Sequence, residues 1–339
     1  MALAPREVLC PKRMHHGPCG GVRDDLACEI VPARCPFTMR DAPVPWSGPD
    51  ARDRPEPPLL TLAATRPVVL TDLTVPPFDE RGLTAVVRAL AGSCDGLLVG
   101  EHQGRPDFPP SLMTALVREA GGAAWITLTC RDRNRVVLEQ ELAGLVTARA
   151  AGVFCATGDG RAPGVRPEVT QVFDVDGTQL AAMAAAAGLP VAVPEAPEAP
   201  PRRLRPGRLR EKQRAGAQFA ILNHVGSTTR MANFLAAARA AGVTIPLLAG
   251  VAVYTDAHSA AVLQHFPGLQ LDDDRVAAVL GAPDPVAAGI AEAVAEARGL
   301  LALDGIVGVN LSGLGSSHGP AAGAEIKAAV GDELIRGTA

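Results

Sequence analysis

Aromatic side chains are scarce in this chain of 339 residues: they make up 3% of it, with eight Phe, two Trp and a single Tyr. The core must therefore be built from Ala, Val and Leu, and the hydrophobic content of 47% is ample for that. Long apolar runs are missing as well. No 18-residue segment is both apolar and free of charge, and no apolar run precedes a cleavage site, which predicts a cytoplasmic protein without a membrane span.

A strong charge of either sign is also absent. The formal net charge is −4, which argues against a nucleic-acid partner and against binding at a membrane surface. No Gly-x-Gly-x-x-Gly stretch opens a helix after the first predicted strand, which counts against a dinucleotide-binding fold. The sequence therefore gives no sign of a nucleic acid, a membrane or a Rossmann-type cofactor site.

What the chain does have is a cysteine cluster near its amino terminus, within 26 residues: Cys10, Cys19, Cys28 and Cys35. This segment is too short to bury a core, so a metal bound by the thiols would supply its folding energy. Because disulfides are rare in the cytoplasm, we predict a zinc site. The spacing contains no Cys-x-x-Cys pair, so an iron–sulfur cluster and a segment without metal stay open. His15 or His16 could replace one thiol.

The remainder of the chain divides by composition. Residues 41–66 are rich in proline and charge, which predicts an extended linker or surface strap rather than a core element. Over residues 67–339, eight short apolar runs alternate with Ala-rich stretches, several of which end at glycine. Continuous apolar runs are typical of strands covered on both faces. We therefore predict a (β/α)8 TIM barrel over 67–339, preceded by a cysteine-rich metal-binding segment over 1–40. A doubly wound open sheet is the alternative.

Polar side chains follow seven of the eight predicted strands at their carboxyl ends. Active sites of (β/α)8 barrels lie at this end of the strands. The polar residues there include Asp72, Glu101, Thr129, Asp159, Glu195, Asn223, His224 and Asn310. Their clustering predicts an active site in this face of the barrel.

Two short motifs resemble a known family. Thr-Leu-Thr-Cys at 127–130 is followed about 30 residues later by Ala-Thr-Gly-Asp at 156–159, which resembles the His-Leu-Thr-Cys and Leu-Arg-Gly-Asp strands of methylenetetrahydrofolate reductase. Further matches are Phe-Asp-Val-Asp at 173–176, Pro-Glu ending at Glu195, Lys212 ahead of an Ala-Gly-Ala, and Asn223. The resemblance covers roughly residues 66–313. The amino-terminal Cys-Pro-Lys, Gly-Pro-Cys-Gly-Gly and Cys-Glu resemble the small cysteine domain that acetogen-type reductases carry as a partner subunit or a fused domain.

The resemblance implies a flavin-dependent oxidoreductase that interconverts 5,10-methylene- and 5-methyl-tetrahydrofolate by hydride transfer through FAD. In this family an Asp at the position of Asp159 lies near the flavin, where it tunes the potential and helps to orient the pterin. The residues expected at the cofactor are Thr129, Arg131, Thr157, Gly158, Asp159, Phe173, Asp174, Glu195 and Lys212. On the folate we expect Asn223, His224 and Asn310. The expected partners are a folate, NAD(P)H or an electron-donor protein, and a second copy of the chain in a homo-oligomer.

The chain departs from the family at several contacts. The family's first-strand glutamate, which is its general acid, corresponds here to Asp72, one position early. Thr127, Val193 and Thr157 replace a histidine, a tyrosine and an arginine. Asp72 and Glu101 are the candidate acids for protonating the folate nitrogen, and Glu101 is favoured because it ends its strand. Both carboxylates could instead hold barrel loops.

The arginine-rich run and Lys212 each have two interpretations, one structural and one functional. The arginine-rich run 131–135 is either a solvated loop with internal salt bridges or a grip on a flavin phosphate or on the folate glutamate tail. Lys212 is either a surface lysine or a flavin contact. If the altered contacts abolish the standard reaction, the chain is a divergent folate-pocket enzyme for another one-carbon–amine substrate. A third alternative is a non-catalytic subunit whose cysteine segment docks an electron-transfer partner.

Overall fold

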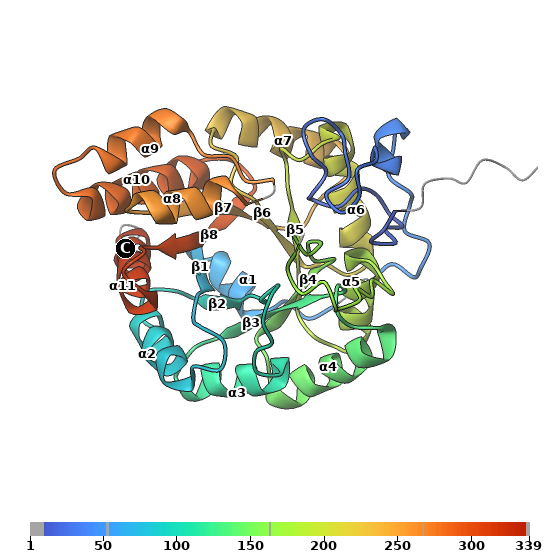
Figure 1. Ribbon diagram of the computed structural model, residues 1–339, viewed down its shortest axis with the longest axis horizontal. Coiled ribbons are helices and arrows are strands. Elements are labelled where there is room, and N and C mark those ends of the chain that lie inside the picture. Colours follow the sequence, from blue (N-terminus) through green and yellow to red (C-terminus); the bar gives the residue numbers. More distant parts are fainter. Residues whose placement is uncertain (1–9, 52–53, 163, 267, 337–339) are drawn as a thin grey trace, which may run out of the picture.

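The computed structural model of the chain describes residues 10–51, 54–162, 164–266 and 268–336. Its centre is a closed barrel of eight parallel strands that pair in chain order, which confirms the predicted (β/α)8 fold (Figure 1). The strands are β1 (Val68–Leu73), β2 (Gly96–Val99), β3 (Ala124–Thr129), β4 (Gly152–Ala156), β5 (Val191–Glu195), β6 (Phe219–Leu222), β7 (Leu247–Tyr254) and β8 (Ile306–Gly315). Most of their residues are buried, as expected for strands with the barrel interior on one face and helices on the other.

A ring of helices surrounds the barrel (Figure 1). The ring consists of α2 (Glu80–Leu90), α3 (Pro110–Glu119), α4 (Arg135–Ala148), α5 (Gly177–Ala186), α6 (Arg205–Arg214), α7 (Thr228–Ala240), α8 (Ala257–Gln264), α9 (Asp273–Leu280), α10 (Pro285–Leu301) and α11 (Pro320–Arg336), whereas the short α1 (Pro58–Ala63) is drawn at the centre of the barrel. The connection from β7 to β8 holds α8, α9 and α10, and α11 closes the ring beside α2. Within the described ranges, no helix combines the length and the apolar character needed to cross a membrane.

The interior of the barrel holds one aromatic pair among aliphatic side chains, and a short helix caps it. The rings of Trp125 and Phe219 pack edge to face with their centres 4.9 Å apart. A Cβ at Gly152 would lie 2.1 Å from the Trp125 ring, so the indole fits only because this position is glycine. Leu59 and Leu60 of α1 join the same cluster. The segment expected to be a linker therefore contributes two leucines to the core, because its Pro-rich sequence concealed one helical turn of apolar residues.

The amino-terminal segment packs along one side of the barrel, against α5 and α6, where Figure 1 draws it in blue. It contains a single 3₁₀ turn, η1 (Pro36–Met39). Further along, the backbone N–H of Trp46 donates to Glu211 Oε2 of α6 at 2.6 Å. Arg54 then donates to Gly216 O, just beyond α6, at 2.8 Å. The Pro-rich stretch is thus a strap that follows α6 from the carboxyl face of the barrel toward the opposite end.

Candidate functional site

Two polar side chains on the neighbouring strands β1 and β8 lie inside the barrel near its carboxyl-terminal mouth. Asn310 of β8 donates from Nδ2 to Asp72 Oδ1 of β1 at 2.9 Å and to Ser312 Oγ at 3.0 Å. Because side chains alternate along a strand, Asp72 points inward like Leu70 of the interior cluster, and Asn223 follows β6 at the same inward spacing. Asn310 is 3% exposed, and its Oδ1 has no hydrogen-bond partner among the described residues. A buried amide oxygen without a partner is costly, so this atom suits a ligand N–H.

Lys327 of α11 supports the Asp72 backbone from outside the barrel wall. Its Nζ donates to Asp72 O at 2.7 Å, and the side chain is almost fully buried. Burial lowers the pKa of this ammonium, while Asp72 and Cys94 oppose the shift. The helix that follows the last strand therefore fixes the end of the first strand.

Glu101, the favoured acid, is held in a separate network. Its Oε2 accepts a hydrogen bond from Thr129 Oγ1 at 2.6 Å, and its Oε1 accepts one from Arg133 Nη1 at 2.6 Å. Both carboxylate oxygens therefore hold the β3–α4 turn against the end of β2. Asp72, by contrast, makes one side-chain hydrogen bond among the described residues. The geometry favours Asp72 as the carboxylate that meets a ligand and the loop-holding alternative for Glu101.

Lys12, from the Cys-Pro-Lys motif, enters the carboxyl face of the barrel from the amino-terminal segment. Its Nζ donates to Gly158 O at 2.6 Å and forms an ion pair with Glu29. The side chain is 2% exposed. The amino-terminal segment and the end of β4 therefore share one buried polar site.

Asp159 lies beside this ion pair. Burial raises the pKa of its carboxyl; Lys12 and Arg131 oppose the shift, and Glu29 adds to it. Burial alone would lower the pKa of the Lys12 ammonium, but Cys19, Glu29 and Asp159 together raise it. The carboxylate expected beside a flavin thus faces a lysine of the amino-terminal segment.

Glu195, at the end of β5, is the centre of a buried cationic cluster. Lys212 Nζ lies 2.8 Å and Arg208 Nε 3.7 Å from Glu195 Oε2, and Arg205 Nη1 lies 3.6 Å from Oε1. Burial raises the pKa of Glu195, but the three cations outweigh burial and hold it below its ordinary value. Burial lowers the pKa of Lys212 to about 8, although the negative charge of Glu195 acts to raise it. Arg205 also donates to Cys19 O at 2.9 Å, which ties the cluster to the amino-terminal segment.

Other residues expected at a flavin also have partners within the chain. Thr157 Oγ1 accepts from Gly177 N at 2.9 Å, and Asp174 accepts from the first backbone N–H of α4 at 2.9 Å. Phe173 is 1% exposed, with Lys12 Nζ 5.8 Å from its ring centre. These contacts and the pairs above engage Thr129, Thr157, Asp174, Glu195 and Lys212, whereas no described residue hydrogen-bonds to the Asp159 side chain. The described residues therefore do not fit FAD in the predicted arrangement.

We accordingly expect FAD to bind the full chain weakly. A phosphate at Lys212 would first have to separate the buried Glu195–Lys212 pair, and breaking such a pair is strongly unfavourable. A fluorescence titration should show no saturable quenching of FAD in the micromolar range. Micromolar binding that Lys212→Met abolishes would contradict this expectation and reinstate the flavin site.

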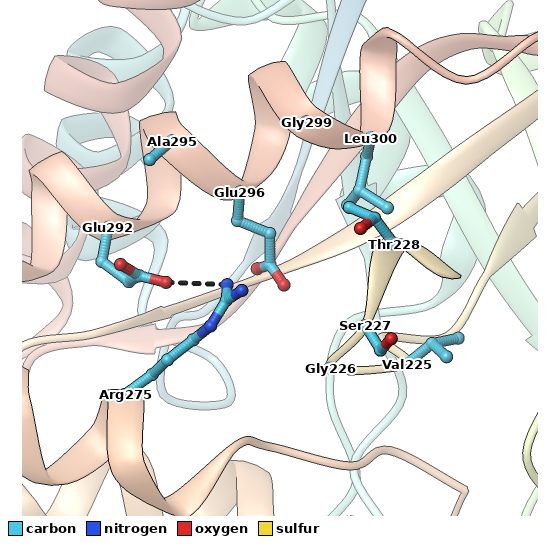
Figure 2. Close-up of a pocket in the computed structure, with 10 residues that line it drawn as sticks. All are labelled: Val225, Gly226, Ser227, Thr228, Arg275, Glu292, Ala295, Glu296, Gly299 and Leu300. Carbon is cyan, nitrogen blue, oxygen red and sulfur yellow. Dashed lines mark hydrogen bonds and ion pairs between the residues drawn. The ribbon is translucent and has the colours of Figure 1, made fainter. Parts of the chain in front are cut away.

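His224, expected at the folate, points away from the barrel axis. Its Nδ1 lies 2.5 Å from Gln270 O, and its Nε2 lies 2.6 Å from Glu296 Oε1 of α10. Glu296 lines a cavity of about 390 Å³ between the start of α7 and α10, where Arg275 pairs with Glu292 at 2.9 Å (Figure 2). Of the two residues after β6 that were expected at the folate, only Asn223 continues the inward face of the strand.

The predicted metal site draws on the four clustered cysteines, and all four lie within the described residues. Cys19 Sγ donates to Glu29 Oε1 at 3.3 Å, and all four cysteines are free thiols. Burial raises the pKa of Cys19 to about 12; Lys12 opposes this and Glu29 adds to it. Across the described part of the chain, no group of three or more His, Cys, Asp or Glu side chains is arranged to hold a metal ion. This arrangement does not fit the predicted zinc or iron–sulfur site, which stays a prediction from the sequence.

Comparisons with known proteins bear on the fold. No family model and no curated protein matches the chain. Among solved structures, it is similar to an uncharacterized protein from Clostridium thermocellum that binds two copies of 5-methyl-5,6,7,8-tetrahydrofolic acid, with 12% identity and a TM-score of 0.56 over 82% of this chain and 99% of that one. Tryptophan synthase from M. tuberculosis (14%, TM-score 0.46, 83% and 99%) and oxaloacetate acetylhydrolase (12%, 0.47, 79% and 84%) are also similar. At 12% identity, the first similarity shows the barrel fold alone.

Proposed function

We propose that this chain binds a reduced folate in the mouth of its barrel and takes part in one-carbon chemistry. The observation that carries the proposal is the Asp72–Asn310 pair, with the unpartnered Oδ1 of Asn310 at the end of the barrel axis. One edge of a pterin presents amino and ring N–H donors next to a carbonyl acceptor. The carboxylate of Asp72 and the unpartnered amide oxygen of Asn310 can accept from those N–H donors. The binding of 5-methyl-5,6,7,8-tetrahydrofolic acid by the Clostridium thermocellum barrel protein supports this class of ligand.

The surroundings of the pair suit a flat ligand. A Cβ at Gly100, at the end of the neighbouring β2, would meet no atom within 4 Å, so there is open space on that side. Asn223 approaches the axis from β6, on the other side of the barrel. In this proposal Asp72 and the Oδ1 of Asn310 accept hydrogen bonds from the pterin, and Lys327 keeps the Asp72 backbone in position.

Reduction of the one-carbon unit through FAD is the finer prediction from the sequence. Most of the residues expected at the flavin are paired within the chain, so the proposal assigns no step to that cofactor. A folate-carrying subunit without turnover is the second candidate, and the specific observation for it is the Lys12–Glu29 ion pair beside Asp159. Oxidation of 5-methyltetrahydrofolate with a redox dye as the electron acceptor separates the two: turnover supports an enzyme, and binding without turnover supports a carrier.

Substitution of Asp72 tests the site. Asp72→Asn should weaken the binding of 5-methyltetrahydrofolate about tenfold to a hundredfold in isothermal titration, because hydrogen bonds to charged groups contribute about 1.5–3 kcal/mol. The matched control is Asp304→Asn, an exposed aspartate just before β8 at the opposite end of the barrel, which should bind like the wild type. If Glu101→Gln is the damaging change and Asp72→Asn is harmless, the assignment of the two carboxylates is reversed.

A further inference from the structure

A second cavity of about 370 Å³ lies beside the proposed folate site, over the carboxyl ends of β2 and β3 and the loop after β4. We refer to it as the arginine cleft. Its lining combines apolar side chains, among them Phe108 and Met113, with five arginines and three carboxylates. Gly100 and Thr127 line the cleft and also continue the inward faces of β2 and β3. The cleft and the mouth of the barrel are therefore continuous.

The carboxylates in the cleft already have partners. Glu101 is held by Thr129 and Arg133, as described above. Asp107 accepts from the backbone N–H groups of Phe78 and Phe108 at 2.9 and 2.8 Å. The third, Asp132, accepts from two arginines of the cleft. The arginines that line the cleft outnumber the carboxylates, so its lining carries a net positive charge.

Arg161 has one guanidinium nitrogen without a hydrogen-bond partner among the described residues. Its Nε donates to Gln103 O at 3.1 Å, and its Nη2 pairs with Asp132 Oδ1 at 2.7 Å. The side chain is 10% exposed, and Nη1 is buried without a hydrogen-bond acceptor in the part of the chain that the structure describes. A buried guanidinium N–H is costly when it has no acceptor. A ligand oxygen in the cleft would supply one.

We propose that the arginine cleft binds the anionic tail of the folate whose pterin lies at Asp72 and Asn310. The aminobenzoyl ring packs on Phe108 and Met113, and the γ-linked glutamate carboxylates lie against Arg161 and its neighbours. A planar guanidinium suits carboxylates because it can form two parallel hydrogen bonds with one of them. This inference rests on the proposed function and adds the substrate class, a polyglutamylated reduced folate.

Isothermal titration of the full chain with 5-methyltetrahydrofolate that carries one or five glutamates tests the inference. The wild type should bind the pentaglutamate at least tenfold more tightly, and added salt should narrow the gap because it screens the carboxylates. Arg161→Gln should remove most of this difference in affinity between the two ligands. Arg88→Gln, the same change at an exposed arginine of α2, should preserve it.

The outcomes separate the two proposals. Equal affinity of the wild type for the two ligands overturns the tail site and leaves the folate function standing, and this arm does not depend on whether the Arg161 variant folds. Failure to bind either ligand overturns both. If inorganic phosphate, but not an equal concentration of chloride, cancels the preference for five glutamates, the cleft is a phosphate site and the assignment to glutamate is overturned.

Discussion

Lys12→Met should lower the free energy of unfolding by about 3–5 kcal/mol, the usual effect of removing one partner from a buried ion pair. Met preserves the length and the apolar stem of the side chain, so the change removes mainly the charge and the hydrogen bond to Gly158 O. Glu29 and Asp159 would then lose the cation that they share, and among the described residues only Arg131 would still offset the charge of Asp159. We expect residues 10–51 to leave the barrel first, which limited proteolysis detects, while chemical denaturation measures the loss of stability.

Arg13→Met is the matched control because it removes the same charge from the next residue. The Arg13 side chain is 68% exposed, and its Nη1 lies 3.8 Å from Asp174 Oδ1, so its loss should cost under about 1 kcal/mol. The pKa of Lys12 is raised, so its charge stabilises the fold below the unfolded value of about 10.4 and this contribution is lost as pH rises through the folded value. The difference in unfolding free energy between the wild type and Lys12→Met should therefore become smaller in strong alkali. Equal stability of the two variants at neutral pH would contradict the account of Lys12.

Glu195→Gln should also lower the free energy of unfolding by about 3–5 kcal/mol. The change leaves Arg205, Arg208 and Lys212 buried without their shared carboxylate. The double variant Glu195→Gln, Lys212→Met removes one of the surplus cations and should recover part of the loss. Thermal and chemical denaturation of both variants measure this.

Glu198→Gln is the control for this cluster. Its carboxylate is also buried, but its partners Arg202 and Arg230 are 60% and 45% exposed, so water can replace it and the change should be mild. The pKa of Glu195 is lowered, so its contribution is complete above the unfolded value of about 4.3 and is lost as pH falls through the folded value. The difference in unfolding free energy between the wild type and Glu195→Gln should therefore disappear in acid. A difference that persists unchanged there would mean that the charge of Glu195 is not what stabilises the cluster.

The barrel could be predicted because its signal is local. Each strand is a continuous apolar run, and buried parallel strands leave that pattern in the sequence whatever surrounds them. The signal is weaker in α11, where Gly323 and Gly331 lie against the backbone. A Cβ at either residue would come within 2.0 Å of a carbonyl oxygen, Leu314 O or Ser93 O respectively. Close approach to the barrel thus requires glycine, which is a poor helix former, at two positions of the helix.

The site could be predicted only in part. Asp72 and Asn310 follow from their place at strand ends, and strand alternation could have separated the inward Asn223 from His224. The sequence could not show that Glu101 has both oxygens occupied, because Arg133 reaches it from another loop. Nor could it show that Lys12 reaches the end of β4, 146 residues away. Such contacts depend on tertiary packing, which short motifs do not encode.

Isothermal titration of the full-length wild-type chain with 5-methyltetrahydrofolate tests the central claim most directly. The account predicts saturable binding with a micromolar or tighter dissociation constant, and competition by a pterin that lacks the tail, because the pterin contacts Asp72 and Asn310. No heat of binding at millimolar ligand, with the chain folded by circular dichroism, would contradict the claim that the mouth of this barrel is a folate site.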